Sequence, residues 1–176
     1  RAEEGDGEGG RRKGLTAEWP TMRIYIESTI PSYVVARPAR DLLQAARQQI
    51  TKDWWDFQRG KHDLFTSQVV LDEIAVGESV MAQRRLELMA GIRTVELSSA
   101  AEVFAVQVLQ SGLLPVSADG DAAHIALATV HKLDILLTWN CRHIANAMIV
   151  GPLRRLAERH GHVLPEICTP EELLGE

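Results

Sequence analysis

Four polar residues have the types and positions of a metal site: Glu27, Glu73, Asp121 and Asn140. Each follows an expected strand or lies on the helix after one, so that a sheet of parallel strands would bring them toward one edge. Carboxylates gathered without basic partners repel one another, and a hard cation with oxygen ligands, Mg²⁺ or Mn²⁺, stabilises such a group. Two or three carboxylates around that ion, with positions left for water, can activate the water against a phosphodiester.

Each of these residues also has an ordinary structural explanation. Asp121 in the first turn of a helix opposes the helix dipole, Asn140 can cap a helix, and Glu73 can be a solvent-exposed helical residue. Glu27 is harder to explain in this way, because it stands between a buried strand and a loop containing Pro31, where no local preference favours an acid. The residue types alone therefore leave both explanations open.

The elements that must position these residues alternate between strand and helix. The expected strands are apolar without period-two alternation, which indicates a parallel sheet covered on both faces. The fold class is therefore α/β, and such sheets bind their ligands outside the carboxyl ends of the strands. We expect strands at 23–26, 63–66, 93–97, 135–138 and 166–168, helices at 39–59, 69–76, 79–90, 100–110, 118–131 and 141–160, and a last helix start at 169–172.

Composition limits the class of protein. The chain has 176 residues, of which 45% are hydrophobic and 24% charged, and this fits one globular domain. No apolar run approaches the roughly 18 residues of a membrane span. Cys141 and Cys168 give neither a disulfide framework nor a paired zinc-ligand spacing. We therefore expect a soluble protein of the reducing cytoplasm.

The net charge of −5 argues against holding nucleic acid by bulk electrostatics, because phosphate binding depends on Lys and Arg. Any contact with RNA must then be local. The arginine clusters available for it are Arg84 with Arg85, and Arg154, Arg155 and Arg159. Clusters of this kind are usually solvated helix faces.

Residues 1–21 are rich in Gly and charge and nearly empty of large apolar side chains. They cannot bury enough surface to offset the entropy of ordering, and they lack the apolar core of a signal peptide. Met22 stands where an ordinary start would. We therefore expect a disordered extension at 1–21 and one folded domain at 22–176.

The sequence around the four polar residues resembles, in order, the four motifs of PIN-domain proteins. The match is most specific in the last two motifs. The corresponding segments are 24–29 (IYIEST), 67–74 (SQVVLDEI), 121–128 (DAAHIALA) and 136–140 (LLTWN). The resemblance spans 22–176, and it includes segments typical of a VapC-like subgroup at 141–147 (CRHIANA) and 167–172 (ICTPEE).

The resemblance implies a three-layer α/β/α nuclease with a central parallel sheet. Many such proteins are toxins that cut RNA with Mg²⁺ or Mn²⁺, and a cognate antitoxin silences them; the resemblance also suggests a homodimer. By position, Glu27 matches the first acid, Glu73 the second and Asp121 the third, and these three would hold the metal. Asn140, near the fourth acid, would orient the attacking water or a phosphate oxygen. The implied function is a Mg²⁺-dependent ribonuclease of a VapBC-type toxin–antitoxin pair.

Two departures from the PIN pattern leave another interpretation open. Glu27 stands where most PIN domains have Asp, and Asn140 offers an amide oxygen without charge. The three remaining carboxylates still outweigh one divalent ion, whereas a second metal is not expected. The alternative is a catalytically degenerate PIN domain that binds RNA or a protein. A metal-binding signalling domain of flavodoxin-like topology is a further alternative, but its phosphoacceptor Asp and late-strand Lys are not at the expected places.

Other candidate ligands have ordinary explanations. His124 falls one turn after the third acid, and we expect it to pack on an apolar helix face, with an acid or base role as the alternative. His160 and His162 lie where a long helix should end, which suits the negative end of its dipole, and we do not expect a metal there. Asp119 should cap its helix, with metal ligation as the alternative. Asp134 is excluded as a ligand, because it lies six residues before Asn140 and should therefore be roughly 20 Å from it, at the opposite edge of the sheet.

Overall fold

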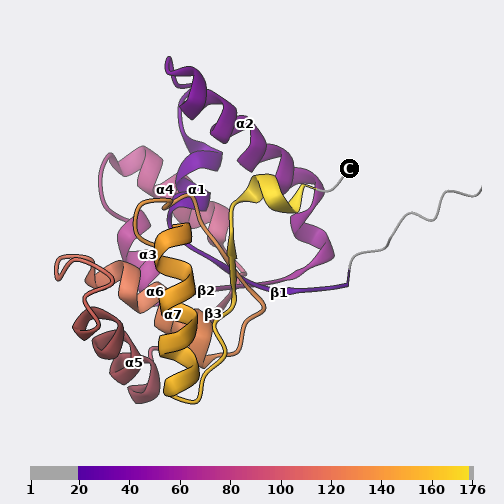
Figure 1. The fold of residues 1–176 in the computed structure, drawn as a ribbon. Helices are drawn as coiled ribbons and strands as arrows, with labels where there is room; N and C mark the ends of the chain where they lie inside the picture. The colour runs from indigo at the N-terminus through magenta and orange to yellow at the C-terminus, as the bar shows by residue number, and fades with distance from the viewer. Residues whose placement is uncertain (1–19, 175–176) are drawn as a thin grey trace, which may run out of the picture.

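Five short parallel strands form one sheet at the centre of the structure. The computed structural model describes residues 20–174, and its strands lie in the order β3-β2-β1-β4-β5 (Figure 1). They are β1 Arg23–Ile26, β2 Asp63–Ser67, β3 Arg93–Val95, β4 Ile135–Leu137 and β5 Glu166–Cys168. The expected α/β class is therefore confirmed, and each expected strand is present within two residues of its predicted ends.

Helices connect the strands and cover the sheet on both faces, which gives the expected three-layer arrangement. Helices α5, α6 and α7 lie together on one side, and α1, α2 and α4 gather on the other (Figure 1). The helices are α1 Thr29–Val35, α2 Leu42–Phe57, α3 Gln68–Ile74, α4 Ser79–Met89, α5 Ser99–Gln110, α6 Asp119–Val130 and α7 Ala147–Arg159. Two 3₁₀ turns are η1 Arg59–Lys61 and η2 Pro170–Leu173, and the capping box expected at Thr169 and Glu172 is present.

The core lies around β1, β4 and α6. Ile24, Tyr25 and Ile26 of β1 are all buried, as is every residue of β4, because helices pack on both faces of these strands. Each fully buried large apolar side chain stabilises the fold by roughly 1.5–3 kcal/mol. Helix α6 is buried along most of its length. The core therefore fixes the ends of β1 and β4 and the first turns of α6 firmly relative to one another.

Two helices differ from the sequence expectation. Helix α1 was not predicted, because Pro31 suggested a loop; it is the third residue of the helix, where its missing N–H costs no hydrogen bond. The prediction of a helix from Cys141 is wrong for residues 141–146, which form turns. The N-cap of α7 is Asn146, whose side chain accepts a hydrogen bond from the Met148 N–H.

The strand order places the expected site at a topological switch point. From β1 the chain proceeds to β2 and β3 on one side, and it then returns to β4 and β5 on the other side of β1. In open α/β sheets, ligands bind in the crevice outside the carboxyl ends of the strands at such a reversal. Here that crevice lies beyond Ile26 and Leu137. The order also differs from the 2-1-3-4-5 order of flavodoxin-like sheets, which contradicts the signalling-domain alternative.

The structure also bears on the remaining expectations from composition. No helix within residues 20–174 is long and apolar enough to cross a membrane. Neither cysteine forms a disulfide: Cys141 is exposed, and burial raises the pKa of the Cys168 thiol to about 12. Of the extension expected at 1–21, all but Pro20 and Thr21 lie outside the described residues.

Candidate metal centre and its surroundings

Glu27 is a buried carboxylate that several donors hold in place. It follows β1 directly, and only 3% of its surface is exposed. Its oxygens accept hydrogen bonds from Ser28 Oγ at 2.7 Å and Thr29 N at 3.0 Å. A further bond comes from Thr138 Oγ1, just beyond β4, at 2.8 Å. These hydrogen bonds fix the orientation of the carboxylate, so that its oxygens are held at the switch point.

Glu73 approaches the same place from α3 and is held by a histidine of α6. Its Oε2 lies 3.0 Å from Nε2 of His124, whose other ring nitrogen lies 3.0 Å from the Tyr25 hydroxyl. That hydroxyl is 2.7 Å from Oγ of Ser67, which caps α3 by accepting from the Val70 N–H. The cap of the helix that carries Glu73 is thus part of the same hydrogen-bonded chain.

The ionisation of this pair follows from its surroundings. Burial alone lowers the pKa of the His124 imidazole, but the hydrogen bond to Glu73 and the neighbouring carboxylates raise it above its ordinary value on balance. Burial raises the pKa of Glu73, yet the hydrogen bond and charge of His124 outweigh it and leave that pKa below the ordinary value. In the metal-free protein, His124 therefore offsets the charge of the acids beside it.

Glu27, Glu73 and His124 form a group that could hold a metal ion. One ligand atom from each can be chosen so that all lie within 4.8 Å of one another. Two oxygens and one imidazole nitrogen suit a divalent ion such as Mn²⁺. Glu73 has 36% of its side chain exposed, so that one side of the group is open to water.

Gly120 leaves the room that the Glu73 carboxylate occupies. A Cβ atom added at Gly120 would lie 2.8 Å from Oε1 of Glu73, which is closer than real Cβ contacts come. The glycine is not required by its backbone angles, because its φ is not positive. Its missing side chain therefore serves the placement of Glu73, and this supports a site built around that carboxylate.

Asp121 and Asn140, the other two residues predicted for the site, lie together beside this group. Oδ1 of Asp121 accepts a hydrogen bond from Nδ2 of Asn140 at 2.8 Å, and Oδ2 lies 2.7 Å from Nδ1 of His143. Asn140 is connected to the metal group, because its backbone N–H donates to the Thr138 hydroxyl that in turn donates to Glu27. Asp121 is not part of the group of three ligand atoms.

Sequence reasoning missed the roles of two histidines. His124 is buried as expected, with 1% of its surface exposed, but both of its ring nitrogens make polar contacts. The signal was its position one turn after Asp121 on a helix otherwise made of small and apolar residues. His143 was hidden by the incorrect helix prediction, since its contact with Asp121 depends on the turns at 141–146.

The remaining acids and most of the arginines lie elsewhere. Asp134 precedes β4 and accepts from the Arg23 N–H, at the amino end of the sheet as expected. Asp119 is the first residue of α6, and its side chain forms no cap. Arg85 donates to the carbonyl oxygen of Ile74, the last residue of α3, and to that of Val76 just beyond it. Arg154 pairs with Glu166. Arg155 and Arg159 line a groove of about 620 Å³ beside α7.

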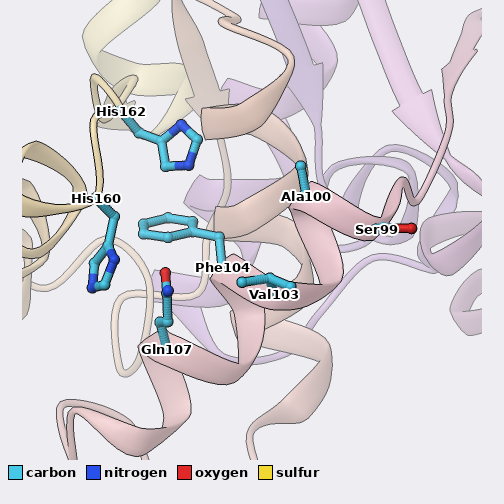
Figure 2. Close-up of a pocket in the computed structure, with 7 residues that line it drawn as sticks. All are labelled: Ser99, Ala100, Val103, Phe104, Gln107, His160 and His162. Carbon is cyan, nitrogen blue, oxygen red and sulfur yellow. The ribbon is translucent and has the colours of Figure 1, made fainter.

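A second hollow lies at the carboxyl end of α7, away from Glu27, Glu73 and Asp121. It has a volume of about 340 Å³ and lies between the first half of α5 and the turn after α7. Figure 2 shows His160 and His162 beside the ring of Phe104, with ring centroids 6.3 and 5.0 Å away. His160 is the C-cap of α7, as expected for the histidine pair. Because α7 is roughly 20 Å long, this hollow is separate from the site at the switch point.

Comparisons with known proteins show the fold. No protein-family model matches the chain, and no curated protein matches it. Among solved structures, the chain is similar to one described as VapBC2 from Rickettsia felis bound to a DNA fragment from its promoter. The TM-score is 0.54 at 11% sequence identity, over 84% of this chain and 98% of the other. The fold of the chain therefore matches the PIN-like fold that the resemblance predicted. At this level of identity the similarity shows the fold and nothing about function.

Proposed function

We propose that this protein is a metal-dependent ribonuclease that hydrolyses RNA phosphodiesters. The observation that carries the proposal is the group of Glu27, Glu73 and His124 at the topological switch point of a PIN-like sheet. The fold shared with a VapBC2 protein supports it. The negative charge of the whole chain fits a site that acts on RNA locally and does not hold it over a long surface.

The chain's own residues would bind and orient the ion. A bound Mg²⁺ or Mn²⁺ lowers the pKa of a coordinated water and stabilises charge that develops on a phosphate. Glu27, fixed by donors from Ser28, Thr29 and Thr138, would supply a rigid ligand. Glu73 would supply a second one that faces solvent. The imidazole of His124 suits Mn²⁺ better than Mg²⁺, because Mg²⁺ prefers oxygen ligands.

The test is cleavage of a labelled single-stranded RNA with Mn²⁺, with Mg²⁺ and with a chelator. We expect the wild type to cleave only with metal, and Glu27→Gln and Glu73→Gln each to lose at least about 100-fold in rate. The matched control is Asp72→Asn, an exposed acid next to Glu73 on the same helix, which should cleave like the wild type. Cleavage by both Gln variants at the wild-type rate would exclude this site.

A second candidate function is a catalytically degenerate PIN domain that binds RNA or protein without cutting. Asn140 favours it, because this residue contributes no charge where PIN domains have a fourth acid. The same assay distinguishes the two: a degenerate domain retards RNA on a gel but produces no cleavage with any metal.

We also propose a protein partner, an antitoxin that silences the site. The support is the VapBC2 structure and the exposed apolar side chains Leu42 and Leu43 at the start of α2. A homodimer is proposed on the resemblance alone. Co-expression with a small protein encoded directly upstream should yield a stable complex that does not cleave RNA, and light scattering of each species should give the number of copies.

A further inference from the structure

Trp139 is anchored two residues beyond the end of β4, next to the candidate metal group. Its indole N–H donates to the Thr51 hydroxyl of α2 at 2.7 Å, and its backbone N–H donates to the Thr29 hydroxyl of α1 at 2.8 Å. Only 7% of the residue is exposed. These contacts hold the indole between α1 and α2, so that its ring is a fixed support at this edge of the sheet.

Tyr33 and Arg47 lie against this indole from α1 and α2. The ring centroids of Tyr33 and Trp139 are 6.0 Å apart, with an angle of 41° between the ring planes. The guanidinium carbon of Arg47 lies 5.1 Å from the centroid of the Trp139 ring, which is a cation–π distance. Tyr33 and Arg47 are partly exposed. The three residues, called the aromatic platform below, therefore combine a buried indole with two residues that solvent reaches.

The fold does not use the polar ends of the two exposed members. Within residues 20–174, the Tyr33 hydroxyl makes no hydrogen bond, whereas that of Tyr25 has two partners. Arg47 forms no ion pair in the same part of the chain, whereas Arg93, which also lies over an aromatic ring, pairs with Asp63. Aromatic rings and Arg guanidinium planes are the groups on which the bases of single-stranded RNA stack.

Thr29 connects the platform to the metal group. Its hydroxyl, which accepts from the Trp139 N–H, donates to Oε2 of Glu27. Tyr33 follows Thr29 by four residues in α1, and residues four apart lie on the same face of a helix, about 5.4 Å or one turn from each other. A base on the Tyr33 ring would therefore belong to a nucleotide beside the phosphate at the metal group.

Stacking also explains how an acidic chain can hold RNA. The net charge is −5, which limits binding through phosphate contacts along a long surface. Stacking of a base on an aromatic ring needs no positive charge on the protein, and it adds to the affinity for any base because every base has a π-face. Arg47 supplies a positive charge beside the ring.

We propose that Tyr33 stacks on an unpaired base of the RNA, the base of a nucleotide next to the bond that is cut. The proposal rests on the proposed ribonuclease function, and it names the substrate as single-stranded RNA, because the bases of a duplex are not free to stack on a side chain. Trp139 holds the Tyr33 ring and stays buried itself. Tyr33 is a substrate-binding residue in this assignment and takes no part in making or breaking bonds.

The test is a cycle of changes in the protein and in the RNA. The wild type first cuts a labelled single-stranded RNA in Mn²⁺, and the cut bond is mapped. Two further RNAs then carry an abasic residue, with ribose and phosphate but no base, on one or the other side of that bond. The wild type and Tyr33→Leu, which removes the ring but keeps apolar bulk, are compared on all three RNAs.

We expect one abasic residue to raise the KM of the wild type by about 5- to 150-fold, the loss of one stacked base. Tyr33→Leu should raise KM by a similar factor on ordinary RNA. On that abasic RNA, Tyr33→Leu should cost less than about 2-fold more, because the ring and the base act through each other. The loss should fall on KM and not on kcat, since the stack is present both before and during the reaction.

The controls separate the stack from damage to the site. Tyr33→Phe keeps the ring and should restore the low KM. Phe57→Leu removes an exposed aromatic ring from the end of α2 and should match the wild type on every RNA. The shift in melting temperature with Mn²⁺ should be the same in Tyr33→Leu as in the wild type, because Tyr33 is not a ligand. If Tyr33→Leu loses the same factor on all three RNAs, or loses nothing, the stack is overturned.

Photocrosslinking tests the stack in the wild type alone, and it decides the case in which Tyr33→Leu does not fold. A 5-iodouridine replaces the nucleotide whose base the abasic RNAs identify, and the saturated complex is irradiated without metal. Uracil bases of this kind join to aromatic side chains that stack on them. Mass spectrometry of the peptides should place the crosslink at Tyr33, and a crosslink at other residues only, or none, overturns the proposal.

The remaining outcomes distinguish this proposal from the function on which it rests. A wild type that binds RNA without cutting it overturns the ribonuclease function alone, and the same cycle is then measured by Kd with abasic residues at successive positions. A wild type that neither cuts nor binds RNA overturns both. If Tyr33→Leu cuts RNA like the wild type and loses only its complex with the protein encoded upstream, the platform binds protein and the RNA stack is overturned.

Discussion

Nε2 of His124 lies 3.0 Å from Oε2 of Glu73, and this contact joins a fully buried imidazole to a carboxylate that faces solvent. The pair connects the core to the open side of the site. Tyr25 holds the far side of the imidazole, so that His124 cannot rotate without breaking two hydrogen bonds. The position of Glu73 is therefore set by the core, which is what a rigid metal ligand requires.

This pair makes the stability of the metal-free protein depend on pH. The pKa of His124 is raised above 6.5, so the stability it contributes is fully present below pH 6.5 and is lost as the pH rises through its folded-state pKa. The pKa of Glu73 is lowered below 4.5, so its contribution is present above pH 4.5 and is lost as the pH falls through its folded-state pKa. The contribution of the pair is therefore largest between these two values.

The measurement is urea unfolding of the wild type and of His124→Gln, without metal, from about pH 5 to about pH 9. We expect the difference in the free energy of unfolding to shrink as the pH rises above 6.5. The matched control is His131→Gln, which replaces a partly buried histidine at the C-cap of α6 whose ring contacts a backbone carbonyl, that of Glu96. A difference that stays constant over this range would show that folding does not shift the pKa of His124, and one that grows with pH would show that the buried imidazole is neutral; either result contradicts the raised pKa.

Divalent metal should raise the melting temperature, because an ion that binds the folded state relieves the repulsion between Glu27 and Glu73. At a concentration about 100 times the Kd, the stabilisation is about 2.7 kcal/mol, or roughly 5–10 °C for a domain of this size. Differential scanning fluorimetry with Mn²⁺ and Mg²⁺ measures it. Glu27→Gln and Glu73→Gln should remove the shift, and a flat wild-type profile up to millimolar metal would contradict the site.

The fold was predictable because its strands have a strong local signal. Ile24 to Ile26 and Ile135 to Leu137 are short apolar runs that read as buried parallel strands, and both appear in the structure. The position of Glu27 at the carboxyl end of β1 followed directly. The order of the strands could not be derived from such runs. It depends on which strands pair by hydrogen bonds, and paired strands are far apart in the sequence.

The composition of the site was predictable only in part, for a similar reason. Residue types identified the acids, and the sheet brings Glu27 and Glu73 together. The sequence could not predict that His124, and not Asp121, would lie within 4.8 Å of Glu27 and Glu73. Both residues lie in the first turns of α6, and only their positions around the helix decide the direction in which each side chain points. His143 became visible only once the chain at 141–146 formed turns in place of a helix.

Gly120→Ala should weaken metal binding without harming the fold. The added Cβ would lie 2.8 Å from Oε1 of Glu73, and the flexible end of that side chain is what can shift. Ala in place of Gly in a helix gains roughly 0.5–1 kcal/mol, so the metal-free melting temperature should stay or rise. Calorimetric titration with Mn²⁺ should show a loss of at least about 10-fold in affinity.

The control for this substitution is Gly151→Ala, within α7 and in ordinary contact with its surroundings. It should gain similar stability and keep the wild-type affinity for Mn²⁺. Unchanged affinity in Gly120→Ala would mean that Glu73 is not a ligand, or that it binds metal from another position.

Asn140 offers a test that separates capping from a role in the site. In Asn140→Asp, a carboxylate replaces the amide that donates to Asp121, so a hydrogen bond is lost and like charges face each other. We expect the metal-free protein to lose about 1–3 kcal/mol of stability, or roughly 2–12 °C in melting temperature. Added Mn²⁺ should recover most of this loss, because the new charge strengthens binding of a cation at this edge.

Asn140→Ser is the matched variant, because a serine oxygen can still accept from the His143 N–H but cannot reach Asp121. Its melting temperature should stay within a few degrees of the wild type, since the turn keeps its cap. The Mn²⁺ shift should also stay, whereas RNA cleavage should fall by about 10-fold or more as Asp121 loses its fixed orientation. If Asp and Ser both leave metal affinity and cleavage unchanged, Asn140 only caps the turn, and its hydrogen bond to Asp121 has no part in the reaction.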